Sequence, residues 1–448
     1  MKNLLINLLL VGHALAGFNN SESGMRDDFS SKAVALLSGR DGEAARAEMT
    51  PSPGCVEGDM ELTPEQKDVY YAMREATAEN RDEVRLMALE AFAQWPNKHL
   101  VYRFDASLDN GIKPVFLEAI EIYEQHTVVT FEEALDDYSG TTVPMVVYGL
   151  NKGCTSTIGY VGPRGKMKLQ TGTCNSLGVI LHEIGHALGR IHEHNRSDRD
   201  DFIRIIEPNI LPGFEHNFMK VDQPLLAPYD LQSIMHYGPS AFSRSQWSST
   251  IIPHIEKDSY KMGKQDKMSR LDVFTVNAIY GVDAACPDDL WDKCQRGGVP
   301  NKHCTCDCLP EFEGPYCELV VTQQTECSGH YQLEESGLIS SPGYPENYPS
   351  NAKCSYIIEC SRNEVVQLDF SLFSIEGYDC FYDKMDMMTG DLITETYADE
   401  YCGDSLHGQR LLTKSNVALM KFESDDMYNY EGYQISYLCI PPPDVVSK

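Results

Sequence analysis

The stretch from His182 to His192 constrains this chain more than any other feature. It reads His-Glu-Ile-Gly-His-Ala-Leu-Gly-Arg-Ile-His, so histidines recur at spacings of four and six residues. Residues four apart share one face of an α-helix, and His182 and His186 can therefore present their imidazoles to one ion. Gly189 can adopt positive φ, end the helix and turn the chain back towards that ion, which makes His192 a third ligand. The spacing predicts a metal-binding helix followed by a tight turn.

Three neutral imidazole nitrogens leave one coordination position open, which is typical of a catalytic zinc site. Glu183 follows His182 and would lie beside the ion. A carboxylate there is placed to take a proton from a zinc-bound water whose pKa the metal has lowered, and the hydroxide can then attack a peptide carbonyl. A purely structural zinc would need a fourth protein ligand. The pattern predicts zinc-dependent hydrolysis with Glu183 as the general base.

The residues that follow carry a family resemblance. Residues 182–199 match every fixed position of the extended signature of the astacin family of metzincin metalloproteases. Residues 233–237, Ser-Ile-Met-His-Tyr, resemble the Met-turn of that family. The resemblance implies that Met235 lies beneath the zinc and that Tyr237 stabilises the oxyanion of the transition state. It also implies that Glu193 meets the new N-terminus of the mature enzyme.

For residues 86–283 the resemblance implies an α+β metzincin domain with two lobes and the zinc helix in the cleft between them. The hydrophobic pattern predicts strands at residues 99–104, 128–131 and 143–148. Phe116, Ile120 and Tyr123 recur at helical spacing between the first two. The family pattern pairs Cys154 with Cys174. It usually contains another disulfide, and valines stand at both of its positions here, Val128 and Val282.

Residues 1–16 have the charged, apolar and small-residue regions of a secretory signal peptide. No later apolar run approaches the roughly 20 residues of a membrane span, and the tail, residues 440–448, shows no lipid-anchor signal. We therefore expect a secreted, extracellular protein. The formal charge of −30 argues against nucleic acid or an anionic membrane as a partner.

Residues 17–85 are polar and are interpreted as a propeptide. Val56-Glu57-Gly58-Asp59 resembles the latency motif of astacin zymogens, although Val56 stands where the family has phenylalanine. The resemblance makes Asp59 a zinc ligand in the latent zymogen only. Cys55 is an alternative, because an unpaired thiolate is itself a strong zinc ligand.

Maturation is expected after Arg85 or after Arg81. Cleavage after Arg85 would place Trp95 of Trp95-Pro96 at the tenth position, as in family members. An activating protease is therefore an expected partner.

Residues 284–318 are dense in cysteine and resemble an EGF-like module. Six cysteines in so short a segment leave too little chain for a hydrophobic core, so three bridges would have to stabilise it. EGF-type pairing would join Cys286 to Cys304, Cys294 to Cys306 and Cys308 to Cys317. The alternative is a zinc knuckle built on Cys304, Cys306 and Cys308, which secretion disfavours.

Residues 327–439 resemble a CUB domain, a β-sandwich in which Cys327 would pair with Cys354 and Cys380 with Cys402. Cys360 and Cys439 are additional and could bridge each other. Some CUB domains bind calcium (Ca2+), and Glu376, Asp383 and Asp425 fall near the positions of the ligands. The alternative is that these acidic side chains are simply solvated on a surface loop.

The sequence thus predicts a secreted zinc (Zn2+) endopeptidase, made as a latent zymogen, with EGF-like and CUB modules of the kind common in nematode astacins. Its expected substrates are proteins or peptides, either of the extracellular matrix or precursor proteins. The competing hypothesis is a catalytically silent extracellular protein that uses its EGF-like and CUB modules for interaction alone. An intact Glu183 and an intact Tyr237 favour the enzyme.

Overall fold

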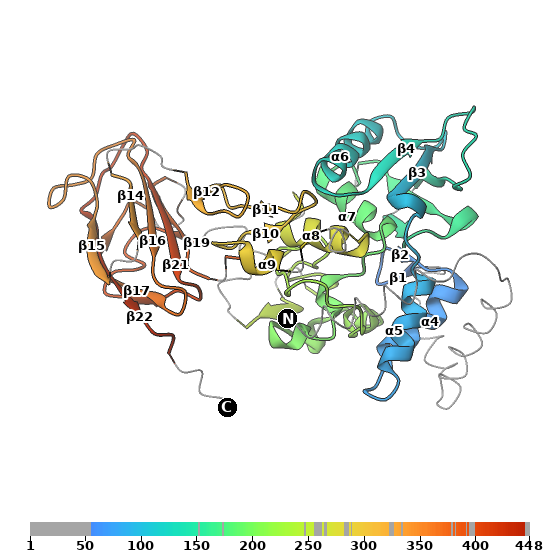
Figure 1. Cartoon of the computed structure of the whole chain (residues 1–448), viewed down its shortest axis with the longest axis horizontal. Helices are drawn as coiled ribbons and strands as arrows, with labels where there is room; N and C mark the ends of the chain where they lie inside the picture. The colour runs from blue at the N-terminus through green and yellow to red at the C-terminus, as the bar shows by residue number, and fades with distance from the viewer. Residues whose placement is uncertain are drawn as a thin grey trace.

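The computed structural model describes residues 55–443 except 151–152, 173, 246–247, 255–261, 264–266, 282–285, 288, 322–326, 333–334, 378–379, 381, 391 and 394–398. The expected signal peptide, residues 17–54 of the expected propeptide and Val282 lie outside the described residues. A mixed α and β domain, a small disulfide-bonded module and a β-sandwich follow one another along the chain (Figure 1). No described helix is both long enough and apolar enough to cross a bilayer.

A seven-stranded sheet forms one lobe of the first domain. Its strand order is β1-β2-β6-β7-β5-β3-β4. The strands are β1 (Cys55–Val56), β2 (Met60–Glu61), β3 (His99–Phe104), β4 (Thr130–Glu133), β5 (Met145–Leu150), β6 (Cys154–Thr157) and β7 (Lys166–Gln170). The strand predicted at residues 99–104 is confirmed, and the other two predicted strands each start two residues later than expected. The sheet is mostly parallel, but β1 runs antiparallel to β2 and β6 runs antiparallel to β7.

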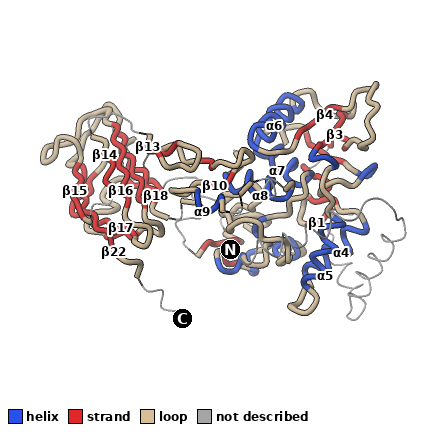
Figure 2. Tube along the Cα trace, in the orientation of Figure 1, coloured by secondary structure: helices blue, strands red, loops and turns tan. Residues whose placement is uncertain are grey.

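Two helices share a hydrophobic core with strands of this sheet. Both are drawn in blue in Figure 2. Helix α6 (Ile112–His126) buries Phe116, Ile120 and Tyr123, as their helical spacing predicted. Helix α7 (Leu177–Ala187) carries the first two histidines and is buried along almost its whole length. The Tyr123 hydroxyl donates a hydrogen bond to the Leu181 carbonyl, 2.9 Å away, which ties the two helices together.

The second lobe contains short 3₁₀ turns, the strands β8 (Ile203–Ile205) and β9 (Ile251–Pro253), and helix α8 (Arg270–Ile279). The Asn277 side chain on α8 accepts from the Val128 amide at 2.9 Å and donates to the His126 carbonyl at 3.1 Å. These bonds hold α8 against the end of α6. They provide a non-covalent link at Val128, where the family usually has a disulfide.

Residues 55–85 pack against the first lobe rather than extending away from it. Helices α4 (Pro64–Arg74) and α5 (Arg81–Ala91) form a hairpin with its own core, which includes Val69, Met73 and Met87 and closes on Ile158 and Ile191. Helix α5 spans the expected boundary between propeptide and enzyme. We refer to residues 55–85 as the prosegment.

The small module consists of α9 (Leu290–Lys293) and the strand pairs β10 (Val299–Pro300) with β11 (Cys306–Asp307) and β12 (Phe312–Glu313) with β13 (Leu319–Val320). Its disulfides are Cys286–Cys304, Cys294–Cys306 and Cys308–Cys317, the EGF-type pairs. All three cysteines of the alternative zinc knuckle are therefore consumed in bridges. The module contacts both neighbours: Lys302 Nζ donates to the Glu124 carbonyl at 2.7 Å, and Arg296 pairs with Glu359 at 3.0 Å.

The C-terminal domain is the expected β-sandwich. One sheet has the order β14-β16-β21-β18-β19 and the other β15-β22-β17-β20. The strands are β14 (Gly329–Gln332), β15 (Ser336–Ser340), β16 (Lys353–Glu359), β17 (Val365–Ser374), β18 (Lys384–Met388), β19 (Asp399–Tyr401), β20 (Arg410–Leu412), β21 (Val417–Glu423) and β22 (Gly432–Ile440). Its disulfides are Cys327–Cys354, Cys360–Cys439 and Cys380–Cys402.

Candidate metal centre and active site

The end of α7 brings the three histidines together. Ser176 caps the start of the helix, and Gly189, at φ 99°, reverses the chain after its last turn. The Gly189 amide donates to the His186 carbonyl at 2.8 Å, and the Arg190 amide donates to the Gly185 carbonyl at 3.0 Å. The turn is thus the one that the position of Gly189 predicted, and it returns His192 to the side of α7.

The ring orientation of each histidine is set by a bond at Nδ1. His182 Nδ1 lies 2.7 Å from the Ile234 carbonyl, and His186 Nδ1 lies 2.8 Å from the Arg190 carbonyl. Because a carbonyl only accepts, both Nδ1 atoms carry the proton and both Nε2 atoms have a free lone pair. His192 Nδ1 lies 2.7 Å from the Glu57 carboxylate.

The Nε2 atoms of the three histidines and the Asp59 carboxylate face one another. Ligand atoms of all four residues lie within 4.8 Å of one another. Asp59 oxygens lie 3.4 Å from His182 Nε2, 3.7 Å from His186 Nε2 and 3.3 Å from His192 Nε2. Two ligands of a tetrahedral zinc are about 3.3 Å apart, so these separations fit that ion.

The unsatisfied polar atoms support the same interpretation. All three Nε2 atoms and Asp59 Oδ1 are buried, and none of them has a hydrogen-bond partner among the described residues. Buried polar atoms normally have a partner, and four orphans that face one point fit a shared cation. The donor set of three imidazoles and one carboxylate matches what zinc accepts.

Glu183 and Tyr237 both lie at this centre. The Glu183 side chain is buried, and its Oε2 has no hydrogen-bond partner within the described ranges. Burial raises its pKa, and the nearby Asp59 charge raises it further. The Tyr237 ring stacks on His194 with centroids 3.9 Å apart, and its hydroxyl donates to the Glu57 carbonyl.

Met235 packs directly against α7, as expected for a Met-turn. A β-carbon at Gly185 would stand 2.8 Å from the Met235 sulfur, so only glycine allows this approach. The Glu193 amide donates to the Met235 carbonyl at 3.0 Å, which joins the turn to the residue after the third histidine. These contacts hold Met235 of the Met-turn, residues 233–237, close to α7.

Glu193, the expected partner of the mature N-terminus, is already bound in this structure. Arg196 donates to its carboxylate at 2.8 Å, the Asp230 amide donates at 3.1 Å, and Arg190 lies 3.7 Å away. Leu86, the expected first residue, lies within α5. The two are not brought together while the prosegment is attached.

Arg190 and Asp272 support the centre although neither was predicted to do so. The Arg190 guanidinium and the Ser233 hydroxyl both donate to Asp272 Oδ1, and the Ile234 amide donates to Oδ2 at 2.8 Å. The carbonyls of Arg190 and Ile234 are the acceptors for His186 and His182. The buried ion pair therefore positions both acceptors. No sequence spacing relates Asp272 to α7.

Glu57 is the most important residue that the sequence reasoning missed. It belongs to the segment that resembles the latency motif, but only Asp59 and Cys55 were weighed there. The Glu57 side chain is fully buried against His192. The Cys55 thiol is unpaired and half-buried, and it is not part of the metal-ligand cluster.

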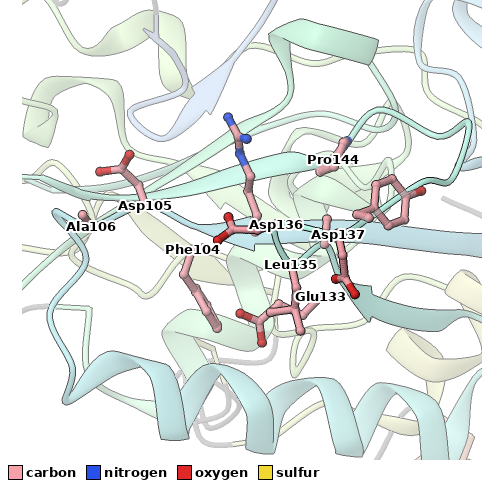
Figure 3. Close-up of a pocket in the computed structure, with 11 residues that line it drawn as sticks. Phe104, Asp105, Ala106, Glu133, Leu135, Asp136, Asp137 and Pro144 are labelled. Atoms are coloured by element: carbon pink, nitrogen blue, oxygen red, sulfur yellow. The ribbon is translucent and has the colours of Figure 1, made fainter.

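A hollow of about 960 Å³ lies elsewhere on the first lobe (Figure 3). Residues 103–106 and 133–138 line most of it, with Asp105, Glu133, Asp136 and Asp137 among them. None of its lining residues belongs to the histidine cluster. The chemistry of the chain is therefore assigned to the histidines rather than to this hollow.

Comparison with known proteins agrees with this geometry. Residues 88–281 match the family model of Astacin, a peptidase family, and residues 327–437 match the model of the CUB domain. Residues 88–281 belong to the astacin family. The α+β fold expected for the astacin domain and the β-sandwich expected for the CUB domain are confirmed.

Protein SpAN of Strongylocentrotus purpuratus is 30% identical to the chain and aligns with 87% of it, over 64% of its own length. Zinc metalloproteinase nas-36 of Caenorhabditis elegans is 32% identical over 83% of the chain and 60% of its own length. The chain thus spans less than two thirds of these relatives. Among solved structures, high choriolytic enzyme 1 of Oryzias latipes, a hatching enzyme zinc-protease, is 33% identical and covers 42% of the chain and 92% of its own, with a TM-score of 0.37.

Proposed function

We propose that the chain is a zinc-dependent endopeptidase of extracellular proteins, secreted as a latent zymogen. One observation carries this proposal: three histidine Nε2 atoms that have no hydrogen-bond partner among the described residues converge beside the buried Glu183. Three protein nitrogens suit a catalytic site that keeps one position open. Membership of the astacin family supports the same reaction class.

His182, His186 and His192 would hold the ion, and zinc bound there would supply a Lewis acid and lower the pKa of water in the site. The free Glu183 Oε2 would accept a proton from the water that attacks the peptide carbonyl and then deliver it to the leaving amine. The Tyr237 hydroxyl would donate to the carbonyl oxygen as that oxygen gains negative charge.

The prosegment would keep the enzyme latent in three ways. Asp59 occupies the space among the histidines. The Tyr237 hydroxyl is engaged by the Glu57 carbonyl, so it is not free to meet a substrate. Strand β2 pairs with β6, which would otherwise lie at the edge of the sheet. We therefore favour Asp59 over Cys55 as the latency ligand, and we propose that an activating protease removes the propeptide by cleaving after Arg85 or after Arg81.

The CUB domain is the proposed site of the second cation, calcium. Carboxylate oxygens of Glu376, Asp383 and Asp425 lie within 4.8 Å of one another. Glu376 Oε2 is buried and has no hydrogen-bond partner in the part of the chain that the structure describes. The pKa of Glu376 is raised by burial and by the other two carboxylates. Oxygen ligands of this kind suit calcium. The EGF-like module, residues 284–318, and the CUB domain, residues 327–439, would recognise substrates of the extracellular matrix or precursor proteins.

The competing function is a silent interaction protein that uses the same modules. The decisive experiment assays the full chain, matured by an external protease, on a denatured-protein substrate with and without a zinc chelator. Chelator-sensitive cleavage that Glu183→Ala lacks would establish the enzyme and its base. Glu118→Ala, on the exposed face of α6, is the matched control and should cleave normally. Zinc binding without cleavage would favour the interaction protein.

A further inference from the structure

Arg270, the first residue of helix α8, contacts both C-terminal modules. Its guanidinium donates hydrogen bonds to the Gly297 carbonyl of the EGF-like module and to the Leu392 carbonyl of the CUB domain. The Asp307 carbonyl of the EGF-like module accepts from the same group at 3.4 Å. Because a charged donor strengthens each of these bonds, one side chain of the astacin domain connects three parts of the chain.

The start of α8 is also covered by apolar side chains of the modules. Leu271 and Phe274 are buried in one cluster with Val299 of the EGF-like module, and Ile393 of the CUB domain packs against that cluster. The rings of Phe274 and Trp291 meet edge to face, with centroids 4.9 Å apart. Figure 1 shows α8 beside α9 and β10, the elements to which Trp291 and Val299 belong. If the modules moved away, these apolar side chains of α8 would lose part of their cover.

The two modules are held against each other as well. Their shared apolar cluster includes Phe312 of the EGF-like module and Ile357 and Leu419 of the CUB domain. A β-carbon at Gly297 would stand 2.6 Å from the Leu392 carbonyl oxygen, so only glycine allows this approach. Close-packed contacts of this kind resist gradual deformation, and the two modules therefore press on α8 as one body.

Asp272, two residues after Arg270, connects α8 to the metal centre. Its carboxylate accepts from the Arg190 guanidinium and from the Ile234 amide, and the Ser269 amide donates to it at 2.9 Å across the first turn of α8. The carbonyls of Arg190 and Ile234 in turn accept from Nδ1 of the two histidines on α7. The orientation of both imidazole rings therefore depends on where the first turn of α8 lies.

We propose that Asp272 is a positioning residue of the metal centre and that the EGF-like and CUB modules hold it in place through the start of α8. This inference rests on the proposed zinc-dependent function, and it gives the modules a second role besides substrate recognition. Loss of the contacts at Arg270 would let the first turn of α8 shift. The two carbonyl acceptors would then be held less firmly, and the affinity of the histidines for zinc would fall.

The zinc affinity of the uncleaved full chain, measured by competition with a chromophoric chelator, tests this without any cleavage. Arg270→Gln changes the astacin side of the junction and is expected to weaken zinc binding about three- to tenfold, in the range for residues that couple two sites. Trp291→Ala changes the module side and should have a similar effect. Asp292→Asn, an exposed neighbour of Trp291 in α9, is the matched control and should bind zinc like the wild type.

A second control separates positioning from a general loss of stability. Asn277→Ala removes two hydrogen bonds at the other end of α8. This variant is expected to lower the melting temperature of the chain while its zinc affinity stays at the wild-type value. If Asn277→Ala weakened zinc binding as much as Arg270→Gln does, the effect would come from instability of α8, and the proposal would be overturned.

A double-mutant cycle then tests whether the modules act through Asp272. Asp272→Asn alone should weaken zinc binding about 10- to 100-fold, the usual cost of losing an outer partner of the ligands. Arg270→Gln should add no further loss in that background, because both changes act on one carboxylate. Wild-type affinity in both Arg270→Gln and Trp291→Ala, or a full further loss in the Asp272→Asn background, overturns the proposal. A chain that binds zinc but cleaves no peptide would contradict the endopeptidase, and these affinities would still decide the role of Asp272.

Discussion

Glu57 Oε2 lies 2.7 Å from Nδ1 of His192, and neither side chain has measurable exposure to solvent. The other two ligand histidines bond to backbone carbonyls of the astacin domain itself. The prosegment therefore supplies both a candidate ligand, Asp59, and the support of the third histidine. A buried carboxylate that accepts from Nδ1 orients the ring and makes Nε2 a better donor to a metal.

We predict that Glu57→Gln lowers the zinc affinity of the full chain by about 10- to 100-fold, the usual cost of losing such a partner. Competition with a chromophoric chelator measures this affinity. Glu65→Gln, an exposed prosegment residue, is the control and should bind zinc like the wild type. Equal affinity for Glu57→Gln would show that the contact does not tune the centre.

The two candidate latency ligands, Asp59 and Cys55, lead to opposite expectations for variants of the uncleaved chain. The uncleaved Asp59→Ala chain is expected to hydrolyse peptides well above the zymogen background, because Asp59 lies among the histidines. The Cys55→Ala chain should remain latent, because its thiol lies outside that cluster. The measurement is initial rate on a quenched peptide, with gel analysis to confirm that the chain is intact. The reverse result would identify a cysteine switch.

Both candidate maturation residues bind one buried aspartate. Arg81 Nε and Arg85 Nη2 each lie 3.1 Å from an Asp222 oxygen, and both arginines belong to helix α5. A protease must unwind the helix and free the arginine before it can cut. Asp222→Asn is expected to speed trypsin cleavage there about two- to fivefold, in keeping with modest ion pairs.

Timed digestion with mass determination of the new N-terminus measures that rate. Asp200→Asn removes a surface ion pair with Lys220 elsewhere in the domain and should leave it unchanged. An unchanged rate for Asp222→Asn would mean that the pairs do not protect the site.

The burial of His236 leads us to expect that the folded chain loses stability in acid. Burial lowers its pKa to about 4, and its Nε2 accepts from the Tyr229 hydroxyl at 2.8 Å while Nδ1 donates to the Tyr237 carbonyl. The pKa of His236 is lower in the folded chain than in the unfolded chain. The stability that neutral His236 contributes to the fold is therefore complete above about pH 6.5 and is lost as the pH falls through about 4. It amounts to roughly 3 kcal/mol at most.

Denaturant unfolding of the full chain between pH 7 and 4 tests this. His236→Gln should flatten the pH dependence, whereas His254→Gln, at an exposed position, should not. Parallel curves for His236→Gln and the wild type would rule out His236 as the source of acid sensitivity.

Calcium is expected to raise the melting temperature of the CUB transition in calorimetry of the full chain. Glu376→Gln should abolish the rise, because it removes a candidate ligand whose Oε2 has no hydrogen-bond partner among the residues that the structure describes. Glu431→Gln, exposed in the same domain, should retain it. A calcium-independent transition in the wild type would leave the three carboxylates as solvated surface groups.

Local patterns predicted much of the fold. The strand at His99–Phe104 and the buried face of α6 follow from periodicities of two and of three to four residues, which act within one element. The predicted strands before α7 each began two residues early, because pairing with neighbouring strands decides where a strand starts. The hairpin of α4 and α5 was not predicted, since its apolar residues alternate with many charges.

The sequence by itself determined the helix that carries His182 and His186, the turn at Gly189 and the return of His192, because these depend on spacings within eleven residues. It also indicated, through family resemblance, the disulfide pairs of the structure other than Cys360–Cys439, whose pairing it left open. Only the tertiary structure placed Glu57 on His192, Asp272 on Arg190 and Glu61 between Lys166 and Lys168. Those contacts join residues 82 to 135 positions apart, or separate strands of one sheet, and no local periodicity encodes such distant pairs.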